Sequence, residues 1–125
     1  MVKLVNGSNG KILAEDLKVA DTFLSRLRGL MFTDTLPSNC ALHIIPCRSI
    51  HSFFMNYAID VVYLNANMQI VAIDEAVAPG KIGKLHKGTI SVVELPAGKV
   101  AATETRVGNY LQKIEKGEDL YVKQI

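Results

Sequence analysis

Short apolar runs separated by turn-forming residues predict β-strands along most of the chain. Val2, Leu4 and residues 12–17 flank the cluster at 6–10, whose Asn and Gly residues are typical of a hairpin turn. Further strands are expected at residues 41–45, 59–64, 69–77, 89–95, 111–114 and 120–122. The last two of these are expected to form a closing hairpin.

One segment has a helical period instead. Between residues 21 and 32 apolar side chains recur at helical spacing, and Asp21 or Thr22 can cap the start. The stretch 99–106 is ambiguous, because its alanines favour a helical turn and its threonines favour a strand. The pattern therefore predicts a mainly β fold, an antiparallel sandwich or partly closed barrel with one amphipathic helix at about residues 21–32.

Length and charge narrow the class further. A chain of 125 residues buries about two thirds of its surface, which favours a single domain over residues 1–125. A net charge of +2 is too weak for a nucleic-acid partner, and no apolar run approaches the roughly 20 residues that span a membrane. Since the start lacks the apolar segment of a signal peptide, we expect a cytoplasmic protein with reduced Cys40 and Cys47.

Two carboxylates interrupt apolar strands. Asp60 lies inside the predicted strand 59–64, and Glu94 lies on the strand face that it shares with Ile90 and Val92. An unpaired buried charge costs several kcal/mol, so Asp60 is expected to meet a donor. The candidate donors are Arg26, Arg28, Arg48 and His51. Structural roles are the alternative: an ion pair or turn cap for Asp60, and the wet end of a strand for Glu94.

Cys40, His43, Cys47 and His51 have the residue types of a zinc site. Pro46 interrupts any helix that would place them on one side, and in a strand residue 40 falls on the opposite face from the other three. We therefore expect no metal site here and no cofactor.

Two further sets of residues have the chemistry of a site, one for copper and one for a catalytic thiol. A copper site of His51, Met55 and Met31 competes with the common role of Met in filling gaps in cores. Cys47, His51 and Asp60 are the residue types of a thiol triad, which would need His51 within hydrogen-bond reach of Cys47. No segment supplies an obvious oxyanion hole.

Four segments carry a resemblance to a known family. They are Arg-Gly-Leu-Met-Phe at 28–32, the stretch 50–61 that contains Ile-His-Ser-Phe-Phe-Met, Val-Glu-Leu-Pro-Ala-Gly at 93–98, and Val-Gly-Asn at 107–109. In this order, over residues 20–111, the chain resembles domain-of-unknown-function family 192, also called uncharacterised protein family 0127. The resemblance implies a compact, mainly β domain with no established activity, cofactor or substrate. The family positions correspond to Gly29, Met31, His51, Met55, Asp60, Glu94 and Gly98.

Two departures from the family are Phe54, where many members have Trp, and Asn109, where many have Asp.

We expect a small binding or accessory protein of bacterial or archaeal type that is not an enzyme and takes a small polar molecule. The candidate ligand-binding residues are His51, Asp60, Glu94, Arg28, Arg48, Cys47 and Met55. The alternatives are a Cys/His-based hydrolase or metalloenzyme, and a structural module that binds another protein.

Overall fold

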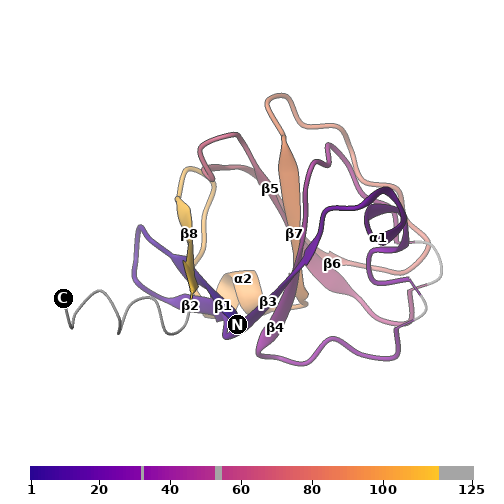
Figure 1. Ribbon diagram of the computed structural model, residues 1–125, viewed down its shortest axis with the longest axis horizontal. Helices are drawn as coiled ribbons and strands as arrows, with labels where there is room; N and C mark the ends of the chain where they lie inside the picture. Colours follow the sequence, from indigo (N-terminus) through magenta and orange to yellow (C-terminus); the bar gives the residue numbers. More distant parts are fainter. Residues whose placement is uncertain (32, 53–54, 116–125) are drawn as a thin grey trace.

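The computed structural model describes residues 1–31, 33–52 and 55–115, whose strands form two sheets (Figure 1). The smaller sheet has the order β2-β1-β8, with β1 at Val2–Asn6, β2 at Ile12–Ala14 and β8 at Leu111–Glu115. The larger has the order β3-β4-β7-β5-β6, formed by β3 Asp16–Ala20, β4 Cys40–Ile44, β7 Ser91–Pro96, β5 Ile59–Leu64 and β6 Ile70–Val77. This confirms the mainly β, sandwich-like class, and the described strands close no barrel.

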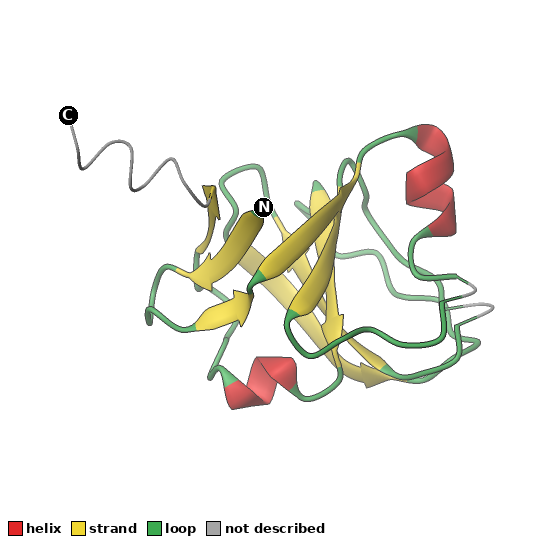
Figure 2. Ribbon diagram, turned by 60° about the horizontal axis from the view of Figure 1, so that its bottom comes forward, coloured by secondary structure: helices red, strands yellow, loops and turns green. Residues whose placement is uncertain are grey.

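The five-stranded sheet separates two apolar cores. Side chains alternate along each strand, so Val62 and Leu95 point to one face while Val61 and Val92 point to the other. The first face packs against the smaller sheet, including Leu4 of β1. The smaller sheet and helix α1 lie on opposite sides of the larger sheet (Figures 1 and 2). Buried on both faces, β5 is apolar along almost its whole length.

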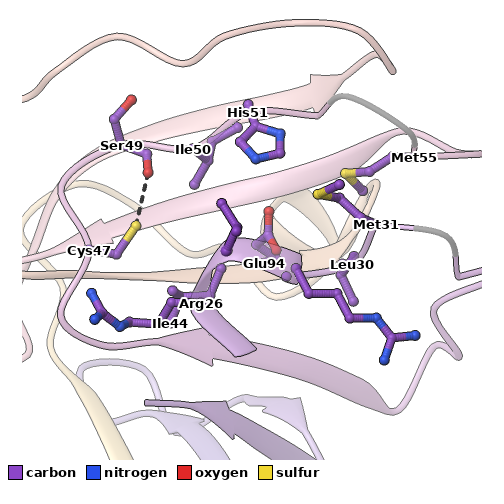
Figure 3. Close-up of a pocket in the computed structure, with 13 residues that line it drawn as sticks. Arg26, Leu30, Met31, Ile44, Cys47, Ser49, Ile50, His51, Met55 and Glu94 are labelled. Carbon is purple, nitrogen blue, oxygen red and sulfur yellow. Dashed lines mark hydrogen bonds between the residues drawn. The ribbon is translucent and has the colours of Figure 1, made fainter. Parts of the chain in front are cut away.

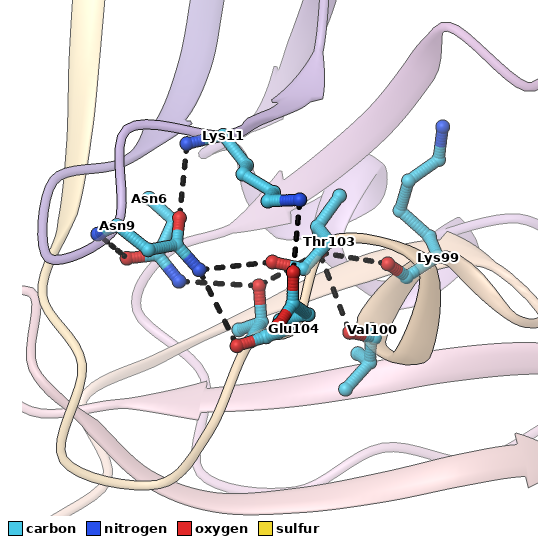
Figure 4. Close-up of polar contacts among 8 residues, drawn as sticks. Asn6, Asn9, Lys11, Lys99, Val100, Thr103 and Glu104 are labelled. Atoms are coloured by element: carbon cyan, nitrogen blue, oxygen red, sulfur yellow. Dashed lines mark hydrogen bonds and ion pairs between the residues drawn. The ribbon is translucent and has the colours of Figure 1, made fainter.

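The predicted N-terminal hairpin is confirmed by the antiparallel pairing of β1 with β2. The turn of this hairpin contacts the residues that follow α2, the short helix Lys99–Ala102, through a hydrogen bond and an ion pair (Figure 4). The Asn9 side chain donates a hydrogen bond to the Thr103 carbonyl at 2.9 Å, and Lys11 forms an ion pair with Glu104 at 2.9 Å. Because α2 occupies residues 99–102, the ambiguous stretch 99–106 begins as a helical turn.

The predicted helix forms but is shorter than expected, since α1 spans Phe23–Arg28. Thr22 caps its start through a reciprocal pair of hydrogen bonds with Ser25. Gly29 ends it with a positive φ of 50°, a conformation that favours glycine. None of its residues is buried, and the exposed apolar ones are Phe23, Leu24 and Leu27. Neither described helix is long and apolar enough to cross a membrane.

Strand pairing departs from the antiparallel prediction at one place. β3 runs parallel to β4, with Leu17 opposite Ala41, because residues 21–39, which include α1, carry the chain back across the sheet. At the other end of the chain, β8 pairs with β1. The partner predicted for β8, at residues 120–122, lies outside the described residues.

Asp60 is fully buried and satisfied by the backbone. Its carboxylate accepts hydrogen bonds from the amides of Ala76 at 2.9 Å, Gly98 at 3.1 Å and Val100 at 3.0 Å. Two of these amides belong to the start of α2, where a carboxylate also meets the positive end of the helix. The donors are therefore amides rather than one of the four cationic side chains considered above, in agreement with the turn-cap alternative.

Replacing this carboxylate should destabilise the fold. Asp60→Ala leaves three amides without their acceptor, which at about 1–1.5 kcal/mol each should lower the free energy of unfolding by about 3–5 kcal/mol. Urea unfolding followed by circular dichroism measures the change. Asp34→Ala, at an exposed position, is the matched control and should change stability by less than about 0.5 kcal/mol. Equal effects of the two substitutions would contradict the capping role.

Candidate functional site

A pocket of about 50 Å³ opens on the face of the larger sheet that carries Val61 (Figure 3). Ile44 of β4 and Glu94 of β7 contribute to it from the sheet. Residues 26–31, at the end of α1 and just after it, form one wall. Residues 47 and 49–51, together with Met55, form the other. Two segments that are distant in the sequence thus form the walls of the pocket, and Glu94 lies between them on the sheet.

Glu94 is the buried acid of this pocket, where the Arg26 Nε atom also lacks a hydrogen-bond partner among the described residues. Its side chain is 2% exposed, and its Oε1 atom has no hydrogen-bond donor among the described residues. Burial raises the pKa of the carboxyl group to about 7. Gly29 packs close by, because a Cβ atom built there would lie 3.5 Å from Oε1. The interpretation of Glu94 as the wet end of a strand is therefore wrong, since the side chain is buried and its Oε1 atom has no donor in the described part of the chain.

The two anomalous carboxylates do not share a cavity. Glu94 pairs with Val61 across the β5–β7 ladder, and Asp60 pairs with Leu95. Because paired residues point to the same face and neighbours alternate, Asp60 and Glu94 point to opposite faces of the sheet. Sequence alternation alone predicts this only if the register between the two strands is known.

Five of the seven candidate residues line the pocket: Arg28, Cys47, His51, Met55 and Glu94. Asp60 does not, as described above. Arg48 is exposed and borders a separate hollow of about 360 Å³ beside residues 85–90. The structure therefore brings together most of the candidate set and leaves two members elsewhere.

Other pocket residues were absent from the candidate set, notably Arg26, Gly29 and Met31. The signal that could have found two of them is the motif at 28–32, which carries part of the family resemblance. Five of the seven positions that the resemblance singles out line this pocket, namely Gly29, Met31, His51, Met55 and Glu94. The other two are joined to each other, because the Gly98 amide donates to Asp60.

Cys47 has the features of a protonated, unreactive thiol. Its sulfhydryl donates to the Ser49 carbonyl at 2.9 Å, and burial raises the thiol pKa. A catalytic cysteine needs the opposite shift, because the thiolate is the nucleophile. Arg26, on the facing wall, donates from Nη1 to the Pro46 carbonyl at 3.2 Å.

Of the four residues considered for zinc, Cys47 and His51 line the pocket and His43 does not. His43 lies on the opposite face of the sheet, fully buried, with Nε2 2.9 Å from the Ser91 hydroxyl. Burial lowers the His43 pKa to about 4, with a smaller contribution from Lys113. Cys40 and Cys47 are both free. Among the described residues, no group of three His, Cys, Asp or Glu side chains is placed to hold a metal ion.

Comparisons with solved structures agree with this fold. A protein of unknown function from Novosphingobium aromaticivorans is similar with a TM-score of 0.77 and 16% identity, covering 89% of this chain and 82% of that one. A protein described as a proposed transcription regulator from Sinorhizobium meliloti has a TM-score of 0.74 and 20% identity, covering 90% and 91%. At these identities the likeness shows the fold alone.

Sequence comparisons give the family. A UPF0127 protein of Thermococcus sibiricus is 32% identical over 114 residues, covering 85% of this chain and 71% of the relative. A UPF0127 protein of Pyrococcus furiosus is 30% identical over 114 residues, covering 87% and 96%. The DUF192 family, described as uncharacterized, matches residues 4–113. Since that match spans most of the sequence, the chain belongs to the DUF192 family.

Proposed function

We propose that the protein binds a small cation or protonated amine at Glu94, as a binding or accessory protein rather than an enzyme. The observation that carries this proposal is the buried carboxylate whose Oε1 atom has no donor in the described part of the chain. Buried polar groups in folded proteins are almost always hydrogen-bonded, and the exceptions call for an explanation. A bound cation supplies the missing partner.

Asp60 provides the internal comparison. Both carboxylates are 2% exposed or less, yet Asp60 has three amide donors and Glu94 Oε1 has none among residues 1–31, 33–52 and 55–115. The fold can therefore satisfy a buried carboxylate with its own backbone where the carboxylate serves structure. Leaving Glu94 unsatisfied costs stability, which a ligand would restore.

The size of the pocket limits the ligand. A cavity of about 50 Å³ holds a few water molecules, an ion or the end of an amine, and it is too small for a whole sugar or nucleotide. The net charge of +2 supports the expectation of no nucleic-acid partner. Two free cysteines are in keeping with the expected cytoplasmic location.

The buried carboxyl makes stability depend on pH. Its pKa is raised from 4.5 to about 7 on folding, so the folded state holds this proton between these pH values and the unfolded state does not. Stability from this group is therefore present below pH 4.5 and is lost as the pH rises towards 7. The difference of about 2.5 pKa units corresponds to about 3 kcal/mol.

Glu94→Gln should remove this dependence. Relative to the wild type, the variant should gain about 3 kcal/mol of unfolding free energy between pH 4.5 and pH 8, because Gln does not ionise. Urea unfolding of both proteins at the two pH values gives the difference. The control, Glu75→Gln at an exposed position, should show little change with pH. A wild-type and Glu94→Gln difference that is independent of pH would refute the assigned ionisation.

Ligand binding can be tested with methylammonium chloride. At ten times its dissociation constant, a ligand that binds only the folded state should stabilise the wild type by about 1.4 kcal/mol, a rise of roughly 3–6 °C in the unfolding midpoint. Glu94→Gln should abolish the rise and Glu75→Gln should keep it. Sodium chloride at equal ionic strength controls for screening, and tetramethylammonium should be excluded by size. Equal responses of the wild type and Glu94→Gln would overturn the proposal.

A further inference from the structure

Two thioether side chains line the Glu94 pocket. Met31 follows α1 and Met55 precedes β5, and both line the pocket together with His51 (Figure 3). Met55 is 5% exposed, while Met31 and His51 are half-buried. Two sulfur donors and an imidazole thus come from three separate positions of the chain to one small cavity.

The donor atoms select a particular class of cation. A thioether is neutral and polarisable, so it coordinates soft ions such as Cu(I) and contributes little to the binding of hard ions such as Mg²⁺ or Ca²⁺. Imidazole is a ligand of copper in many proteins. The Glu94 carboxylate supplies negative charge in the same pocket, and Arg26 and Arg28, which also line it, oppose that charge. The selection of a soft ion therefore depends on the neutral sulfur and imidazole ligands.

We propose that the pocket binds one soft monovalent metal ion, Cu(I) in chemical class, through the sulfur atoms of Met31 and Met55 and the imidazole of His51. This inference rests on the proposed function, because it names which cation the Glu94 pocket takes. A cavity of about 50 Å³ suits a single ion, and its lining of Leu30, Ile44 and Ile50 limits the access of water to the ion.

Packing is the competing explanation, since Met commonly fills irregular gaps in cores and Met55 belongs to the core on this face of the sheet. The two explanations differ in what a Met→Leu substitution does. Leu keeps the volume and apolar character of the side chain at a cost usually below about 1.5 kcal/mol, but it removes the sulfur ligand. Met68 packs against the other core and provides the matched control.

The experiment titrates Ag(I), an air-stable probe for Cu(I), into the full chain labelled with ¹³C at the Met methyl groups. Cys40→Ser and Cys47→Ser are introduced together, because free thiols would otherwise capture silver. Cys47 lines the same pocket, so this background tests the thioether and imidazole ligands without a thiol. We expect the Met31 and Met55 methyl resonances to shift and saturate at one ion per chain, while that of Met68 stays in place. The same spectra show that the background variant is folded.

In this background Met31→Leu and Met55→Leu should each weaken silver binding by about tenfold or more, and Met68→Leu should leave it unchanged. Unshifted Met31 and Met55 resonances at one equivalent of Ag(I), or equal weakening by all three substitutions, would overturn the inference. Methylammonium binding by the same samples separates the two proposals. If the amine binds and silver does not, the metal inference alone fails; if neither binds, the proposed function fails as well.

Discussion

Burial of the larger sheet on both faces is the constraint on which the rest of the structure depends. β5 and β7 lie next to each other near the middle of this sheet, and nearly every side chain on them is enclosed by one core or the other. In such strands any polar residue must be satisfied where it stands, because neither face offers bulk water. The two acids of these strands, Asp60 and Glu94, are therefore the points at which the sequence departs from what packing alone requires.

The protein treats these two acids differently. Asp60 accepts from one amide of β6 and two at the start of α2, so its carboxylate links these two segments of backbone. Glu94 faces the end of α1 and the loops beside it, which contribute apolar, sulfur and cationic side chains but, among the residues that the structure describes, no donor to Oε1. A buried acceptor without a donor lowers the stability of a fold, and natural sequences usually keep costs of this kind at functional sites. The asymmetry between the two acids is the physical basis of the proposed function.

The local sequence pattern predicted where the strands lie, but not which strands pair with each other. The run 59–64 forms β5 with the expected bounds, because β-branched and aromatic residues between turn signals have few other solutions. The parallel pairing of β3 with β4 could not be predicted, since alternation identifies a strand without naming its partner. Helix α1 ends early because Gly29 adopts a positive φ, and helical spacing on both sides of it concealed this.

In the candidate site, too, the sequence identified side chains of the right chemistry but not the groups that surround them. His51 and Glu94 were singled out by chemistry and lie in one pocket. The donors of Asp60 were not foreseen, because backbone amides are present at every position and only the fold determines which of them converge. The sequence marks Met31 both as a possible copper ligand and as part of the motif at 28–32, and the structure places it in the wall of the pocket.

The smaller sheet has a consequence for biosynthesis. β1 stands between β2 and β8, so the first described strand in the sequence pairs with the last one. On the ribosome, β1 can pair with β2 early, but its other edge stays unpaired until residue 115 has been synthesised. The larger sheet needs only residues 16–96, so its strands can pair while the nascent chain still lacks its last segment. The core between the sheets is therefore completed last, when β8 arrives.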